Sequence, residues 1–266
     1  MTGPADIPIS QASTSPESSE DSSDVLKRSF AGRRVAESLQ QALVGGAFSE
    51  SGDGYWVLAV GADEPQSQIS RIRQLDVNCR GCLNVLFPYV YQRRYVPLAC
   101  AECYKVKISI DTVRELVAFA ELAETLPYDY KCGSEVQRRT SSDRYSAYFY
   151  CNGLKAARAV YRDVRSAAAD NALLGAIRMT IKRGCSVYET SCGPSDRYQF
   201  YPEQAELESW LLPRLRDPAI SVPDRRRVKM SWLEIAYRIG DDTYRDFTHG
   251  RSLYPATVSY DPDPAD

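Results

Sequence analysis

Apolar residues recur at helical spacing in four stretches of the chain, and a fifth stretch is amphipathic. The four stretches are residues 25–43, 111–126, 154–170 and 231–242, and the fifth is 205–215. In the second of them, Val113, Leu116 and Val117 share one face, and Asp111 or Thr112 is suited to cap the N-terminus. We therefore expect several amphipathic helices that each bury one face.

Strand-like patterns lie between these helices. Short apolar or alternating runs occupy residues 55–60, 83–87, 104–110 and 145–151. Residues 173–185 fit a helix or a strand equally well, and residues 224–229, "DRRRVK", have the composition of a solvated loop. The mixture predicts an α+β fold, in which a four-cysteine β hairpin resembling a zinc ribbon is followed by helices and packs with a second α+β region.

The chain divides by composition into five regions. Residues 1–26 are rich in Ser, Pro, Asp and Glu and are predicted to be a disordered acidic tail, because they carry too few apolar side chains to offset the entropy of ordering. A helix and strand follow in 27–75, the four-cysteine hairpin and a helix in 76–126, and a basic, tyrosine-rich α+β region in 127–256. Residues 257–266 form a C-terminal tail.

Four of the eight cysteines form two Cys-x-x-Cys pairs. Cys79 and Cys82 make the first pair, Cys100 and Cys103 the second, and residues 83–99 separate them. This spacing is typical of a four-cysteine zinc site, in which each pair reaches the ion from one tight turn. An iron-sulfur cluster also takes four thiolates, so it stays open as the alternative cofactor. The pattern predicts a tetrathiolate site that holds zinc.

The other cysteines follow no standard ligand spacing. Cys132, Cys185 and Cys192 each adjoin a glycine, which suits a tight turn, so they are candidates for a second thiolate site; Cys151 fits a core position. A nucleophilic pair of Cys185 with His249, the single histidine, is a further candidate, although a structural cysteine beside a surface histidine is the favoured explanation of both residues. The sequence contains no recognisable catalytic motif, and a non-enzymatic role is favoured.

Positive charge is concentrated in the middle of a slightly acidic chain. The whole chain has a net charge of −2, whereas residues 131–185 contain eleven basic and four acidic residues. In residues 154–170, Lys155, Arg158, Arg162 and Arg165 lie along one helical face. Such a row neutralises phosphates, although a solvated charged face has the same pattern.

Tyrosines accompany many of the cations. Tyr89, Tyr91 and Tyr95 surround Arg93 and Arg94. Three more tyrosines, Tyr145, Tyr148 and Tyr150, follow Arg144. Unpaired bases stack on aromatic rings beside guanidinium groups, so Arg93 and Arg94 join the candidate anion-binding residues. The same rings would equally suit the edge of a buried sheet.

The sequence therefore predicts a zinc-binding module that contacts RNA or single-stranded DNA through a basic helix. The first alternative is an iron-sulfur or thiol-dependent protein of electron transfer or cofactor assembly, and the second is a zinc-stabilised scaffold for a protein partner. The N-terminus lacks the pattern of a secretory signal, and no run of about 18 apolar residues is present. We expect a cytoplasmic protein without a membrane partner, in which thiols stay reduced.

Overall fold

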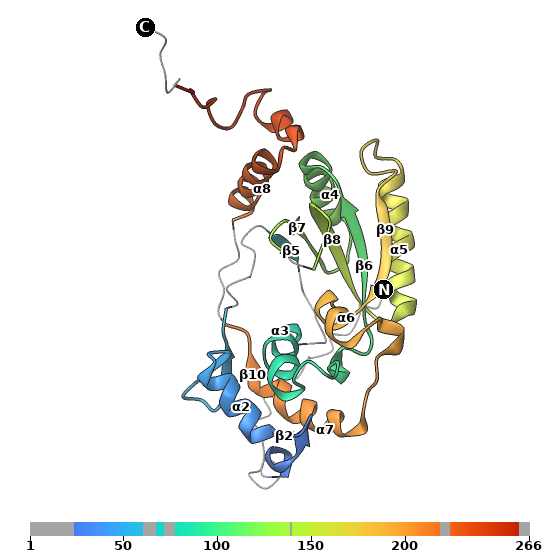
Figure 1. The fold of residues 1–266 in the computed structure, drawn as a ribbon. Coiled ribbons are helices and arrows are strands. Elements are labelled where there is room, and N and C mark those ends of the chain that lie inside the picture. Colours follow the sequence, from blue (N-terminus) through green and yellow to red (C-terminus); the bar gives the residue numbers. More distant parts are fainter. Residues whose placement is uncertain (1–23, 61–67, 72–77, 139, 219–223, 261–266) are drawn as a thin grey trace, which may run out of the picture.

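The chain folds around two hydrophobic cores. Figure 1 shows the fold of the computed structural model. The structure describes residues 24–60, 68–71, 78–138, 140–218 and 224–260. One core surrounds a five-stranded sheet, and we call this part the sheet lobe. The other core draws on residues 24–60, 78–103 and 185–216, and we call this part the small lobe. Helices and sheet coexist in the described residues, which confirms the α+β class.

The sheet lobe contains an antiparallel sheet with the strand order β5-β7-β8-β6-β9. Its strands are β5 (Gln68–Arg71), β6 (Cys103–Ile110), β7 (Tyr130–Ser134), β8 (Tyr145–Asn152) and β9 (Arg178–Arg183). Helix α4 (Val113–Thr125) connects β6 to β7, and α5 (Leu154–Ala169) connects β8 to β9. Each helix joins two parallel strands that are separated by a third strand, which is the split β-α-β topology.

The two faces of this sheet differ in chemistry. Val106, Ile108 and Ile110 of β6 lie on one face and pair across the sheet with Phe149, Ala147 and Tyr145 of β8. This apolar face packs against α4, α5 and α8 (Arg225–Ile239). Because side chains alternate along a strand, the intervening lysines and tyrosines of β6 and β8 lie on the opposite, polar face.

Local sequence signals start and end the helices of the sheet lobe as predicted. Thr112 caps α4 by accepting a hydrogen bond from the Glu115 N–H, and the Glu115 carboxylate accepts one from the Thr112 N–H. Helix α8 ends at Gly240, as expected, but it begins at Arg225, where the Asp224 side chain caps it. Residues 224–229 are thus the start of a helix and not the predicted loop.

The small lobe packs helices against a three-stranded sheet, with the strand order β10-β4-β3. Its larger elements are α2 (Val35–Val44), β3 (Phe48–Glu50), β4 (Trp56–Leu58), η1 (Cys82–Val90), α6 (Ser186–Cys192), α7 (Pro202–Leu211) and β10 (Leu215–Arg216). Short elements complete it: β1 (Ser29–Phe30), β2 (Arg33–Arg34), α3 (Cys79–Gly81), η2 (Leu98–Cys100), η3 (Ser195–Arg197) and η4 (Leu212–Arg214). The segment η5 (Asp242–Phe247) belongs to the sheet lobe, where it contacts α4 and α8.

Two predicted elements differ from the structure. The helix expected over residues 25–43 is interrupted. Residues 24–27 are helical, Ala31 and Gly32 have positive φ and close a hairpin between β1 and β2, and α2 begins at Val35. The spacer between the cysteine pairs is not a β hairpin but the π-helical segment η1, a turn and η2. Val85, Leu86 and Val90 are all fully buried in η1, so the apolar run covers several sides of a helix.

The ambiguous and terminal segments also have clear outcomes. Residues 173–185 contain strand β9. The predicted N-terminal tail lies outside the described residues up to position 23, whereas Val25 is buried in the small lobe. Of the C-terminal tail, residues 257–260 are described and exposed. No helix in the described part of the chain is long and apolar enough to span a bilayer.

Candidate functional site

The first cysteine pair sits on a single helical turn that is fixed at its start. The Asn78 side chain accepts a hydrogen bond from the Gly81 N–H at 2.8 Å and donates one to the Leu215 carbonyl, also at 2.8 Å. A Cβ on Gly81 would lie 3.1 Å from both Asn78 and the Leu215 side chain, so the close approach of β10 favours glycine here. The turn that carries Cys79 and Cys82 is therefore fixed by the Asn78 side chain and by its contact with β10.

The second pair is held by a buried carboxylate. Cys100 ends η2 and Cys103 begins β6. Glu208 of α7 accepts hydrogen bonds from the N–H groups of Leu98 and Ala99 and from the Tyr91 hydroxyl, each at 2.7 Å. Burial raises the pKa of Glu208, although these donors oppose the shift. Glu208 thereby fixes the backbone directly before Cys100.

Replacing Glu208 with alanine should destabilise the small lobe by about 3 kcal/mol, because buried donors lose their acceptor and each costs about 1–3 kcal/mol. The variant Glu203→Ala, at an exposed position on the same helix, should change stability by less than about 1 kcal/mol. Urea denaturation followed by tryptophan fluorescence measures both variants. Equal stabilities of the two variants would contradict the anchoring role of Glu208.

One thiol from each pair meets its counterpart in the core of the small lobe. Cys82 and Cys100 are hydrogen-bonded to each other, and the Cys100 Sγ lies 3.5 Å from the Tyr188 hydroxyl. The Cys82–Cys100 hydrogen bond raises the pKa of Cys82 and lowers that of Cys100. Both side chains are buried, with exposed fractions of 0% and 3%. A thiol–thiol hydrogen bond thus connects the two cysteine pairs, which are distant in sequence.

Cys185 joins the other two thiols of the predicted set. After burial, the Cys185 thiol has the largest effect on the pKa of Cys79, and it also contributes to raising the pKa of Cys103. Burial raises the pKa of Cys79 to about 12 and that of Cys103 to about 11. These thiols therefore stay protonated at neutral pH unless a metal ion replaces their protons. We call Cys79, Cys82, Cys100, Cys103 and Cys185 the thiol cluster.

Lys105 closes the thiol cluster on the side of the sheet. Its Nζ donates a hydrogen bond to the Cys185 Sγ at 2.9 Å and lies 5.4 Å from the centroid of the Tyr150 ring. Burial by itself lowers the pKa of Lys105. The nearby Cys185 and Tyr150 have the larger effect, and the pKa of Lys105 is raised. The cation is 8% exposed and belongs to the polar face. The thiol cluster thus lies where the two lobes meet.

The thiols do not converge on one point as they stand. Among the described residues, no three His, Cys, Asp or Glu side chains are arranged so that they hold a metal ion. All eight cysteines are free thiols. A metal ion would require the buried thiols to rotate away from their present partners.

The sequence placed Cys185 in a separate thiolate site and not beside the two cysteine pairs, because its neighbour Cys103 lies 82 positions earlier in the chain. The Gly184 N–H donates a hydrogen bond to the Cys103 carbonyl at 2.7 Å, which continues the pairing of β9 with β6. That pairing brings Cys185 to the second cysteine pair. The glycine before Cys185 was the only local signal of a turn at this position.

The three cysteines grouped as a second thiolate site are not brought together. Cys132 is buried on the apolar face of the sheet, whereas Cys185 contacts Lys105 on the polar face. The Cys192 Sγ lies 3.6 Å from the Arg93 carbonyl oxygen. His249 follows η5, near the end of β6 that is remote from Cys103, so Cys185 and His249 do not form a nucleophilic pair. Cys151 packs against the core of the sheet lobe, as expected.

The candidate anion-binding residues separate into two groups. Lys155, Arg158 and Arg162 are exposed on α5, and Arg165 is half-buried with its guanidinium 5.8 Å from the Tyr161 ring. The opposite side of α5 buries Ala157, Val160, Val164 and Ala168 against the sheet. Arg93 and Arg94 are exposed at a turn of the small lobe, apart from this helix.

Comparisons with known proteins identify no relative. No protein-family model, no curated protein and no solved structure matches the chain significantly. The chemistry of these residues is therefore the basis for any functional assignment.

Proposed function

We propose that this chain is a metal-thiolate protein that binds single-stranded nucleic acid, RNA or DNA, along α5. The observation that carries the proposal is the row of Lys155, Arg158 and Arg162, which is exposed and has no acidic partner among the residues that the structure describes. A row of unpaired cations on one face suits the regularly spaced phosphates of a nucleic-acid strand.

Several other cations at the surface do have an acidic partner. Arg28 pairs with Glu206 at 2.6 Å, and Lys229 pairs with Glu121 at 2.9 Å. On α5 itself, the nearest acid in sequence is Asp163, whose carboxylate accepts a hydrogen bond from the Tyr128 hydroxyl. The row is thus left without a compensating acid, as a phosphate-binding surface requires.

The thiol cluster supports the metal part of the proposal. Buried thiols from two Cys-x-x-Cys pairs share one place in the fold, and zinc prefers such tetrathiolate sets. Cys79, Cys82, Cys100 and Cys103 would hold the ion, which would link the small lobe to the first residue of β6. Two alternatives follow from the same thiols: an iron-sulfur cluster with an electron-transfer role, or a zinc-stabilised scaffold that binds a protein through its tyrosine-rich surface.

The double variant Arg158→Glu/Arg162→Glu tests the nucleic-acid proposal. It should weaken binding of a labelled oligo(U) or oligo(dT) and lower the slope of log affinity against log salt by about one to two units. Its melting temperature should stay close to that of the wild type, because both side chains are exposed. Fluorescence anisotropy across a series of salt concentrations measures these effects.

A matched control changes the same charge on another helix. Arg226 and Arg227 are exposed on α8, so Arg226→Glu/Arg227→Glu alters the net charge equally and leaves α5 intact. This control should bind with nearly the wild-type affinity and slope. If both double variants lose affinity equally, the effect is one of net charge and the assignment to α5 fails. If the wild type binds neither polymer at low salt, nucleic-acid binding is refuted and the scaffold becomes the better proposal.

A further inference from the structure

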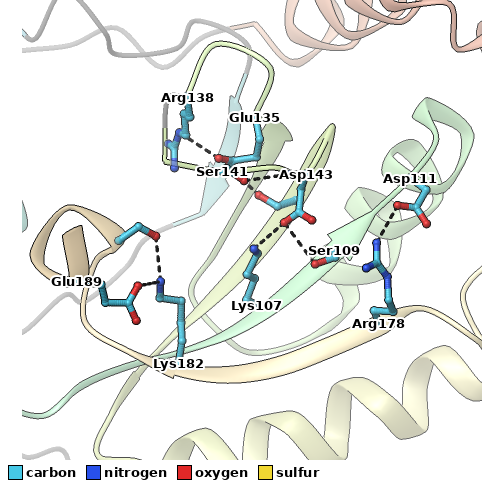
Figure 2. A network of polar contacts seen from close by, with 12 residues as sticks. Lys107, Ser109, Asp111, Glu135, Arg138, Ser141, Asp143, Arg178, Lys182 and Glu189 are labelled. Atoms are coloured by element: carbon cyan, nitrogen blue, oxygen red, sulfur yellow. Dashed lines mark hydrogen bonds and ion pairs between the residues drawn. The ribbon is translucent and has the colours of Figure 1, made fainter. Parts of the chain in front are cut away.

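The polar face of the five-stranded sheet carries a second concentration of cations. This face lies opposite α4 and α5, and part of its network of polar contacts is drawn in Figure 2. Six cations belong to it: Lys105 and Lys107 of β6, Lys131 of β7, Arg178 and Lys182 of β9, and Arg138 of the β7–β8 loop. Four carboxylates face them: Asp111, Glu135, Asp143 and Glu189. Cations are therefore in excess.

Each of the four carboxylates already has a cationic partner. Arg178 pairs with Asp111 at 3.0 Å. Lys107 pairs with Asp143 at 2.6 Å, and Lys182 pairs with Glu189 at 2.7 Å. Arg138 lies 3.4 Å from Glu135, which also accepts a hydrogen bond from Ser146 at 2.6 Å. Figure 2 shows these pairs side by side above the strands. No carboxylate of this network is left for the remaining two lysines.

Lys131 is the cation on this face that lacks a partner. In the portion of the chain that is described, its ammonium group has no hydrogen bond and no ion pair. Burial, together with the nearby Arg138 and Lys105, lowers the pKa of Lys131 to about 8. A partly buried cation among like charges is unfavourable unless an anion joins it. Lys105, by contrast, already donates to Cys185.

Tyrosine rings lie between the lysines. In the register of the sheet, Tyr148 is opposite Lys131 on one side and opposite Lys107 on the other, and Tyr150 is opposite Lys105. Tyr148 is partly exposed. Beyond these rows, at the same end as Asp143 and Arg178, the surface opens into a hollow of about 450 Å³. Rings flanked by cations bind nucleotides by stacking and charge together.

We infer that the polar face is a second contact for single-stranded nucleic acid, where Lys131 binds a phosphate and Tyr148 stacks with a base. The inference rests on the proposed function, because it names where the same ligand meets the sheet. Three features match one nucleotide unit of a strand. The face has more cations than acids, one ammonium group has no partner among the described residues, and a partly exposed tyrosine lies between lysines. The helix α5 supplies charge on the other side of the sheet, so the two surfaces can be tested separately.

Lys131→Met and Tyr148→Leu test this surface, with Tyr148→Phe and Lys229→Met as matched controls. Lys131→Met should lower the salt slope of oligo(U) or oligo(dT) binding by about one unit. Its melting temperature should be equal to that of the wild type or higher, because methionine removes an uncompensated charge.

Tyr148→Leu should weaken binding at least about fivefold, while Tyr148→Phe keeps the ring and retains the affinity. Lys229→Met removes an equal charge from α8 and should leave the slope unchanged.

A second probe separates phosphate binding from stacking. An abasic oligonucleotide should bind Tyr148→Leu and the wild type equally, and it should still bind Lys131→Met more weakly than the wild type. If both polar-face variants bind as the wild type while the α5 double variant loses affinity, the inference is overturned and the proposed function stands. If the α5 variant binds normally and the polar-face variants do not, the inference stands and α5 is the wrong surface. A wild type that binds no single strand overturns both.

Discussion

Replacing Asp241 with alanine should lower the free energy of unfolding by about 3–5 kcal/mol. The carboxylate is 4% exposed and accepts hydrogen bonds from the Val113 N–H at 2.6 Å and the Tyr145 hydroxyl at 3.0 Å. Its other oxygen accepts one from the Thr243 hydroxyl at 2.7 Å. Asp241 thus ties η5 to the start of α4 and to β8. Removing it leaves buried donors without an acceptor, at about 1–3 kcal/mol each.

A neighbouring residue provides the control for this experiment. Asp242 has an exposed side chain that pairs only with Arg245, and exposed ion pairs contribute about 0–1 kcal/mol. Asp242→Ala should therefore unfold at nearly the wild-type urea concentration. Equilibrium denaturation monitored by circular dichroism compares the two variants. A loss below about 1 kcal/mol for Asp241→Ala would show that the donors find other acceptors.

The second large effect is expected from Cys100→Ser, which should remove the metal ion from the proposed site. If Cys79, Cys82, Cys100 and Cys103 hold zinc, the purified wild type should contain one equivalent, and the variant should contain far less. Zinc binding and folding are coupled, and binding contributes about 10 kcal/mol or more in isolated zinc fingers. Here the small lobe has its own apolar core, so we expect partial unfolding of this lobe rather than of the whole chain.

Elemental analysis and an absorption spectrum of anaerobically purified protein decide between the metal alternatives. Zinc thiolates are colourless, whereas an iron-sulfur cluster absorbs visible light. Cys192→Ser is the matched control, because this thiol donates a hydrogen bond to the Arg93 carbonyl and lies outside the thiol cluster. A wild type without metal, or a Cys100→Ser variant with full metal content, would refute the predicted tetrathiolate site.

The local elements of the sheet lobe could be predicted because their signals are local. The capping residue Thr112 and the apolar stripe of α4 lie within a few residues of each other, so periodicity alone defines that helix. In strand β8, the residues from Ala147 to Tyr150 alternate between buried and partly exposed for the same reason. The basic row on α5 also follows from spacing, since residues three and four apart share a helical face.

The small lobe was harder to predict because its signals are not local. The spacer between the cysteine pairs is apolar on several sides, and a short buried run has the same pattern in a strand and in a helix. Packing against α2 and α7 favours the helix over the strand.

In the sheet lobe, residues 224–229 were assigned to a loop because of their charge. Asp224 in fact caps a helix that begins at Arg225.

The sequence by itself determined the α+β class, the two cysteine pairs and the cationic helix, because each depends on neighbouring residues. Only the tertiary structure decided that Cys185 joins Cys79 and Cys103, that Cys132 lies on the opposite face, and that Lys131 is without a partner beside Tyr148. The pairing of β6 with β9 brings Cys185 to the second cysteine pair, and the pairing of β7 with β8 places Lys131 beside Tyr148. Alternation along each strand decides which side chains share a face, but which strands become neighbours depends on how the whole chain packs.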